Sequence, residues 1–144
     1  MMPRWLHFLA AIVFVATIVI QVFLAGAAIA NLGGSGDFGA HTAFGYSIVG
    51  LAALLVLVTA IVARAGGRRI AIAAGMLVLY IVQTVLPNAK TSAPWIAALH
   101  PVNALFLFGL AIWYARLAWP DRAVARPSTS TVEPAAPAPA ADQA

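Results

Sequence analysis

The chain of 144 residues contains no cysteine and few charges. The absence of cysteine excludes disulfide bonds, thiolate metal sites, iron–sulfur clusters and covalently attached c-type haem. Only 8% of the residues are charged, and only four are acidic. The sequence also has no phosphate-binding loop, dinucleotide fingerprint, zinc-protease motif or serine-hydrolase motif. These absences favour a binding protein over an enzyme.

Apolar residues, by contrast, make up 63% of the chain, and its mean hydropathy is +0.96. A soluble domain of this size cannot bury so much apolar surface, so the lipid bilayer is the expected surrounding. We predict an all-α integral membrane four-helix bundle over residues 1–122. Its helices are expected at about 6–30, 38–63, 70–87 and 94–118, each close to the roughly 20 residues that cross a bilayer.

The basic residues predict how this bundle is oriented. Seven of the eight fall on one side of the predicted helices, and only Lys90 falls on the other. The positive-inside rule then places both termini in the cytoplasm of a bacterium, with the bundle in its inner membrane. The Pro- and Ala-rich segment 123–144 is predicted to be a disordered cytoplasmic tail. The pI of about 10.4 therefore reflects topology and anionic lipid, and no nucleic-acid partner is expected.

An internal repeat is visible when the two halves are aligned. The first half reads "IVIQVFLAG", a loop and "AHTAFG"; the second reads "YIVQTVLPN", a loop and "LHPVNA". Each half thus places a glutamine before a loop and a histidine after it. We predict two parallel helical hairpins related by an axis along the membrane normal. Coincidence between apolar segments is one alternative; a signal peptide ending at "AAIA" is another, although its cleavage would remove half of the repeat.

Polar residues gather in the half of the predicted bundle that faces away from the cytoplasm. Because polar groups are costly in hydrocarbon, we expect them to line a pocket inside the bundle. Asp37 and Ser92 are predicted to cap the second and fourth helices, which places His41 and His100 at similar depth. Pro101 is expected to kink or restart the fourth helix.

Two facing histidines fit a haem better than a bare metal ion. Zinc and copper usually take three or four protein ligands, whereas haem needs at most two axial ligands. We therefore predict haem b with His41 and His100 as the iron ligands. One turn deeper, Gly45 and Ala104 are small and would leave room for the macrocycle.

Three amides complete the predicted cofactor site. Gln21 and Gln83 are expected to orient the histidines or to bind haem propionates, and Asn103 to line the pocket. Hydrogen bonding between helices, with no cofactor, is the alternative role for both glutamines.

These residues resemble the four-helix, bis-histidine haem-binding half of the heme A synthase family. The resemblance covers most of residues 18–110, through "IQVFLAG", "AHTAFG", "VQTVLPN" and "LHPVNALFLF". The chain also resembles a group of uncharacterised small four-helix bacterial membrane proteins. By this resemblance His41 and His100 correspond to axial haem ligands.

Several departures limit what the resemblance implies. Heme A synthases have a glutamate three residues before the histidine and an arginine after it, where this chain has Phe38 and Thr42. The loop cysteine pair is missing, and only half the usual helices are present. Oxidation of a haem methyl group is therefore not expected.

Three functional hypotheses remain at this point. The first is a small b-type cytochrome for electron transfer or haem handling, which would need a redox partner protein, a quinone or a second haem in a homo-oligomer. The second is a cofactor-free accessory subunit, and the third is a small transporter or proton relay. His7, beside Trp5, is interpreted as an interfacial residue with no part in any of these.

Overall fold

A computed structural model of the chain describes residues 2–120. The helices are α1 (Met2–Ile29), α2 (Gly39–Phe44), the π-helix η1 (Gly45–Val49), α3 (Gly50–Val62), α4 (Gly67–Val85), the 3₁₀-helix η2 (Leu86–Lys90), α5 (Pro94–Ala97) and α6 (Leu99–Leu117). They form four spans that are long and apolar enough to cross a membrane. The protein is therefore an all-α, multi-pass membrane bundle, as predicted. The predicted tail, 123–144, lies outside the described residues.

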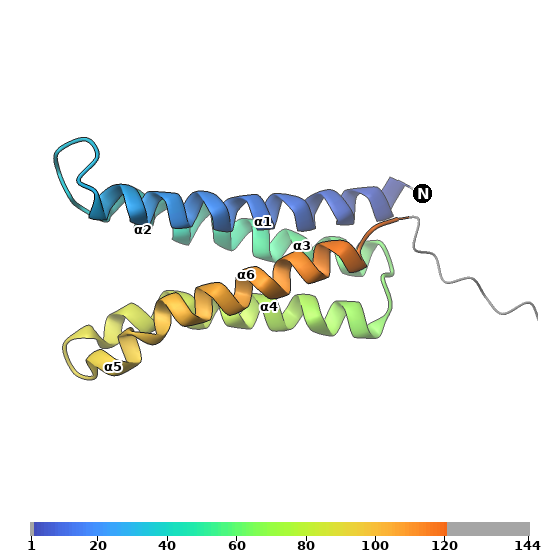
Figure 1. Cartoon of the computed structure of the whole chain (residues 1–144). Helices are drawn as coiled ribbons and strands as arrows, with labels where there is room; N and C mark the ends of the chain where they lie inside the picture. Colours follow the sequence, from blue (N-terminus) through green and yellow to red (C-terminus); the bar gives the residue numbers. More distant parts are fainter. Residues whose placement is uncertain (1, 121–144) are drawn as a thin grey trace, which may run out of the picture.

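The four spans form two hairpins that run in the same direction (Figure 1). The helix α1 packs against α3 and α6, and α4 packs against the same two helices. One end of the bundle, which we call the arginine end, holds the start of α1, the loop 63–66 and the end of α6. The other, the histidine end, holds the loops 30–38 and 91–93, and toward it the two hairpins diverge (Figure 1). Which end faces the cytoplasm remains a prediction from the basic residues.

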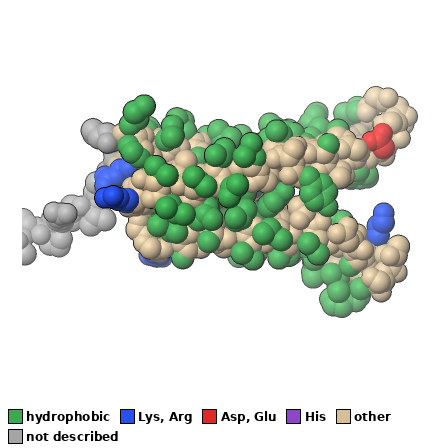
Figure 2. All heavy atoms as spheres, turned by 180° about the vertical axis from the view of Figure 1, so that it is seen from behind, with side chains coloured by type: hydrophobic (Ala, Val, Ile, Leu, Met, Phe, Trp, Pro, Cys, Tyr) green, Lys and Arg blue, Asp and Glu red, His purple; other side chains and the backbone are tan. Residues whose placement is uncertain are grey.

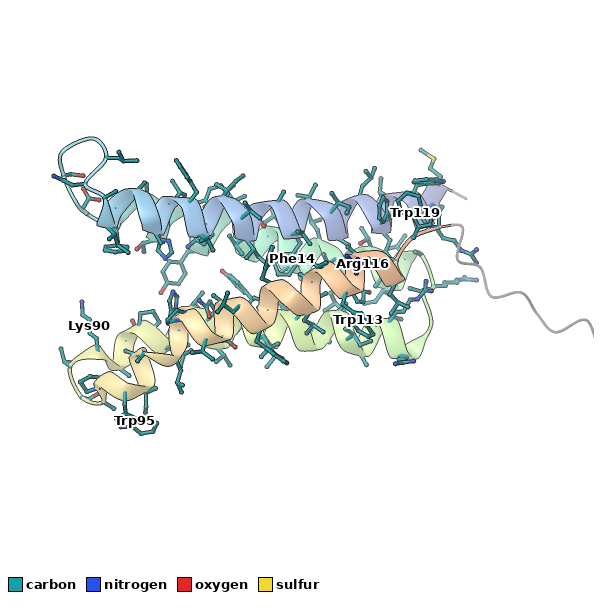
Figure 3. All side chains as sticks on the ribbon, in the orientation of Figure 1. Phe14, Lys90, Trp95, Trp113, Arg116 and Trp119 are labelled. Atoms are coloured by element: carbon teal, nitrogen blue, oxygen red, sulfur yellow. The ribbon has the colours of Figure 1, made fainter. Side chains whose placement is uncertain are left out.

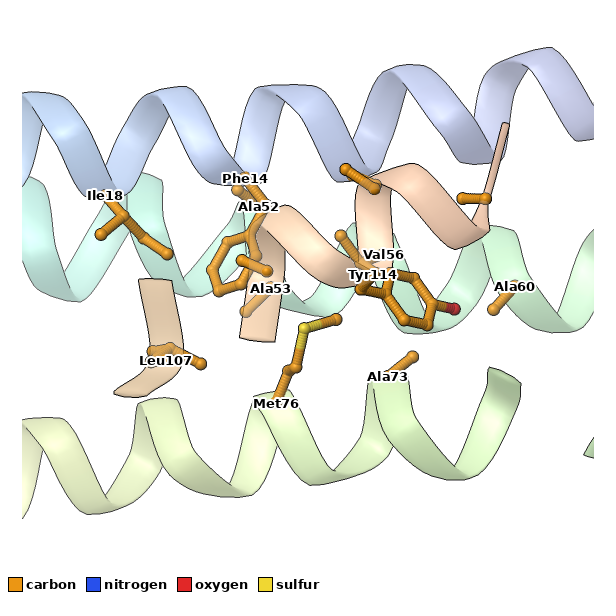
Figure 4. Packing of buried hydrophobic residues seen from close by; sticks show 14 of the residues in the cluster. Phe14, Ile18, Ala52, Ala53, Val56, Ala60, Ala73, Met76, Leu107 and Tyr114 are labelled. Atoms are coloured by element: carbon orange, nitrogen blue, oxygen red, sulfur yellow. The ribbon is translucent and has the colours of Figure 1, made fainter. Parts of the chain in front are cut away.

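The core lies between the hairpins and combines a few large side chains with many alanines (Figure 4). The largest fully buried side chains are those of Phe14, Val56, Met76 and Tyr114. The alanines around them let the helices approach closely, which is how membrane helices gain packing energy in the absence of a hydrophobic driving force. Most other large apolar side chains point outward over the whole length of the bundle (Figure 2). This exposed apolar belt is the surface that lipid covers.

A π-helical turn interrupts the second span, and no pattern in the sequence predicted it. The wider i→i+5 turn of η1 disturbs the regular pairing of backbone carbonyls. The Tyr80 hydroxyl, from the other hairpin, reaches the carbonyl oxygens of Gly45 at 3.1 Å and of Tyr46 at 3.3 Å. Gly50 is required beside it, because a Cβ at this position would collide with the Tyr80 oxygen. The π-turn is thus a point of contact between the hairpins.

We expect Tyr80→Phe to lower the free energy of unfolding by about 1 kcal/mol, because the carbonyls of η1 lose a hydroxyl donor. Unfolding by SDS in mixed micelles, followed by circular dichroism, measures this. Tyr46→Phe is the matched control: its hydroxyl is 3.4 Å from the Thr84 carbonyl oxygen, and the side chain is 58% exposed. An equal loss in both variants would contradict the role given to Tyr80.

The ends of the helices at the histidine end differ in part from the prediction. Asp37 does not occupy the cap position, which is Phe38; its Oδ1 instead accepts a hydrogen bond from the Gly39 N–H at 2.7 Å. Hydrogen bonds from the Ser35 side chain and this N–H lower the pKa of Asp37. Ser92 was also predicted one residue too early, because the cap position of α5 is Ala93 and no side chain caps it.

Pro101 interrupts the helix about one turn before its own position in the sequence. The fourth span is interrupted at Ala98, between α5 and α6. Proline has no N–H to donate to the carbonyl of the residue four positions earlier, here Ala97, so the helical hydrogen bonds lapse at this point. The predicted restart of the helix is therefore confirmed, and it lies just before His100.

Candidate functional site

Gln21 of α1 and His41 of α2 hold each other through three hydrogen bonds, and we call this pair the first clasp. The His41 Nδ1 donates to the Gln21 carbonyl oxygen at 3.1 Å. The Gln21 amide Nε2 lies 2.9 Å from the His41 carbonyl oxygen and 3.2 Å from the His41 Nε2. A carbonyl only accepts and an amide nitrogen only donates, so Nδ1 carries the proton and Nε2 presents its lone pair. The clasp therefore fixes a neutral imidazole in one tautomer.

Gln83 of α4 and His100 of α6 repeat this arrangement as the second clasp. The His100 Nδ1 donates to the Gln83 carbonyl oxygen at 2.9 Å, and the Gln83 Nε2 donates to the His100 Nε2 at 3.2 Å. The tautomer is the same as in the first clasp. The parallel repeat predicted from sequence thus extends to individual hydrogen bonds.

The two clasps differ in how their glutamine oxygens are satisfied. In the second, the Asn103 Nδ2 donates to the Gln83 Oε1 at 2.6 Å and to the Leu79 carbonyl oxygen at 3.1 Å. In the first, Phe44 stands at the position that corresponds to Asn103. The Gln21 Oε1 is consequently buried without a hydrogen-bond partner in the described part of the chain. Such a buried acceptor is unusual, because leaving it unpaired costs about 1–3 kcal/mol.

The two histidine rings come from different hairpins and lie next to each other. Their centres are 6.2 Å apart, and the ring planes are inclined at 68°. Both side chains are half-buried. Side chains of both hairpins point into the space that opens between them toward the histidine end (Figure 3), and the molecular surface is notched there (Figure 2). The fold therefore brings the predicted ligand pair together.

The two small residues one turn deeper have different surroundings. A Cβ at Gly45 would lie 2.6 Å from the Gln21 Nε2, so the missing side chain makes room for the amide of the first clasp. Ala104, its counterpart after His100, is half-buried on α6. Gly45 thus acts on the histidine through Gln21, a role that the sequence did not indicate.

The donor set at this site is limited to the two histidines. Within residues 2–120, no three side chains of His, Cys, Asp or Glu are close enough together to share a metal ion. A metal held here would have to receive its remaining ligands from a group that brings its own, as haem does.

The prediction for His7 was wrong, because the residue is buried rather than interfacial. Only 2% of it is exposed. Its Nδ1 lies 3.1 Å from the Thr59 Oγ1 and its Nε2 lies 3.2 Å from the Tyr114 Oη, which in turn lies 3.1 Å from the Arg69 carbonyl oxygen. The physical reason is that His7, in the second turn of α1, lies on the face that packs against Thr59 of α3 and Tyr114 of α6.

A signal for this second polar cluster was present in the sequence. His7, Thr59 and Tyr114 are polar residues in the otherwise apolar half of the bundle at the arginine end, and they belong to three different spans. The expected cost of polar groups in hydrocarbon, which predicted the pocket at the histidine end, applies equally to them.

The chain was compared with family models, curated proteins and solved structures. No curated protein and no solved structure matches the chain. The resemblance to heme A synthases therefore remains a prediction from the motifs. Residues 21–91, which include the whole first clasp and Gln83 of the second, are similar to the model of a family of unknown function, DUF6220.

Proposed function

We propose that this protein is a small b-type haem protein of the bacterial inner membrane, with one haem held between His41 and His100. The observation that carries the proposal is the pair of clasps. Each supplies a neutral imidazole whose Nδ1–H is held by a backbone carbonyl, and this is the arrangement typical of histidines that ligate metals.

The spacing of the rings supports the same assignment. A metal lies about 2 Å from each ligating imidazole nitrogen, and each nitrogen lies about 1 Å from its ring centre. The ring centres of His41 and His100 are 6.2 Å apart, so one metal would be within reach of both rings. The two hairpins that carry these rings diverge toward the histidine end (Figure 1).

Each residue of the clasps has a role in this proposal. His41 and His100 would hold the haem iron, and the carbonyls of Gln21 and Gln83 would orient the two rings. Ligation would use the lone pair that now accepts the glutamine amide, which frees each amide to donate to a propionate. Asn103 would hold the Gln83 side chain, while Gly45 and Ala104 keep the flanking turns small.

Bound haem would supply one-electron chemistry or serve as cargo. The basic residues favour a cytoplasmic arginine end, which would place the clasps toward the opposite face. Electrons would then have to be exchanged with a redox partner protein, a quinone or a second copy of the chain.

Absorption spectra of the purified protein test the proposal. The full chain is expressed with haem available, purified in detergent and recorded in the oxidised and reduced states. We expect about one haem per chain, with the spectrum of a six-coordinate bis-histidine haem. His41→Ala and His100→Ala should each abolish this spectrum or convert it to that of a five-coordinate haem.

The matched control is His7→Gln, because His7 is the third histidine and lies in the core at the other end. Glutamine retains a hydrogen-bonding group there, so the variant should fold and keep the full spectrum. A folded but colourless wild-type protein under haem-replete conditions would refute the proposal.

A cofactor-free structural subunit is the second candidate, and a specific observation favours it. Both ring nitrogens of each histidine are already paired within their own hairpin, so the clasps can act as interhelical fasteners without any ligand. The colourless result above is what this candidate predicts. A proton relay has less support, because Asp37, the one acidic residue among 2–120, lies outside the spans.

A further inference from the structure

A hollow at the arginine end is lined by four arginines. Arg4 of α1, Arg64 of the loop after α3, and Arg68 and Arg69 of the first turn of α4 surround it. Its volume is about 820 Å³, within the range of small-molecule sites. His7 and Trp119 also contribute to its wall.

The positive charge of this hollow has no counterpart in the described structure. Asp37 is the one carboxylate side chain among residues 2–120, and it lies at the opposite end of the bundle (Figure 2). Four arginines lining one hollow concentrate positive charge there, and a bound anion would offset the repulsion between them. Arginine recognises phosphate oxygens in a planar, two-pronged geometry, so a phosphate group is the anion that fits.

The backbone at Arg64 adopts a conformation that favours glycine. The end of α3 is a Schellman motif, in which Ala65 N–H donates to the Ala60 oxygen at 3.0 Å and Arg64 N–H to the Ile61 oxygen at 2.9 Å. Arg64 occupies the position of this motif that glycine favours, with φ at +49°. A side chain in the left-handed region is strained, and such strain concentrates at functional sites. Glycine would adopt this backbone conformation without strain, yet the residue here is an arginine.

Hydrogen bonds and ring contacts hold the segments around the hollow in place. The Tyr114 hydroxyl lies 3.1 Å from the Arg69 carbonyl oxygen and 3.2 Å from the buried His7 ring, which positions the start of α4. Trp119 packs on Phe8 and Trp5 with ring centres 4.8 Å and 6.2 Å away. Tryptophan clusters at the ends of membrane spans lie at the level of the lipid headgroups.

We propose that this hollow binds the phosphate headgroup of an anionic phospholipid. Basic pockets at the ends of membrane helices are suited to such headgroups, and this one combines four arginines with tryptophan at headgroup depth. The site is separate from the clasps and does not depend on haem.

Native mass spectrometry of the detergent-solubilised full chain tests the proposal. The chain is titrated with phosphatidylglycerol, cardiolipin and phosphatidylcholine, and we expect selective retention of the two anionic lipids. Arg64→Gly should weaken that retention about fivefold, the effect of one arginine near an anionic surface. Because glycine relieves the positive φ, this variant should be at least as stable as the wild type, so any loss of lipid is not a loss of fold.

The matched control is Lys90→Gln, which removes one positive charge at the histidine end. It should retain anionic lipid within twofold of the wild type. Equal loss in Lys90→Gln and Arg64→Gly would reduce the effect to net charge and overturn the site. Competition by inorganic phosphate at concentrations similar to those of lipid would overturn the lipid assignment in favour of a soluble phosphate ligand.

Discussion

Gly45→Val is expected to lower the free energy of unfolding by about 2–3 kcal/mol. A Cβ at Gly45 would lie 2.6 Å from the Gln21 Nε2. The amide can swing aside, but it then loses its bonds to the His41 ring and carbonyl, and buried groups are left unpaired. The branched valine also overfills the site. Unfolding by SDS in mixed micelles gives the stability, and the same variant should lose haem if the protein binds it.

Gly109→Val is the matched control for Gly45→Val. Nothing lies within 4 Å of a Cβ at Gly109, so the same substitution on α6 should change stability by less than about 0.5 kcal/mol. The double variant Gln21→Ala/Gly45→Val provides a further check, because shortening Gln21 removes the atom that the valine would strike. Equal destabilisation by Gly45→Val and Gly109→Val would show that the first clasp contributes nothing.

Tyr114→Phe is expected to cost about 2 kcal/mol, more than the roughly 1 kcal/mol expected for His7→Leu. Removing the hydroxyl takes a partner from both the buried His7 Nε2 and the Arg69 carbonyl oxygen. Removing the imidazole is milder, because Thr59 keeps its bond to the Leu55 oxygen and Tyr114 keeps its bond to Arg69. A buried polar group that is left without a partner costs more stability than a hydrogen bond from which both partners have been removed.

A double-mutant cycle separates this network from simple packing. If the two side chains act together, His7→Leu/Tyr114→Phe should be less destabilising than the sum of the single changes, by about 1 kcal/mol. Strict additivity would mean that the hydrogen bond between them is energetically unimportant. Neither change touches the clasps, so the spectra of a haem-loaded protein should be preserved.

The predictions that succeeded depended on strong, repeated signals. Four apolar runs determine four spans, because each backbone polar group in lipid must be paired within a helix. The juxtaposition of His41 and His100 followed from the repeated Gln–loop–His order, since two parallel hairpins bring equivalent positions to the same depth. Pro101 marked the break in the fourth span because of its missing N–H.

The features that were missed depend on contacts between distant segments. The π-turn at Gly45–Val49 is sustained by Tyr80 of the other hairpin, and no local pattern indicates that partner. His7 was misplaced because its partners, Thr59 and Tyr114, come from two other spans. Cap positions failed by one residue at Asp37 and Ser92, the usual uncertainty at helix ends.

The two hairpins pack closely at the core and diverge toward the histidine end. The packing around Val56 and Met76 is rich in alanine, and the two histidines lie farther along, one on each hairpin. A small change in the angle between the hairpins at this packing would become a larger displacement between His41 and His100. The separation of the two histidines therefore depends in part on the methyl groups of the core alanines. Replacing one core alanine with a larger residue would therefore change the separation of the two histidines, although it lies far from them.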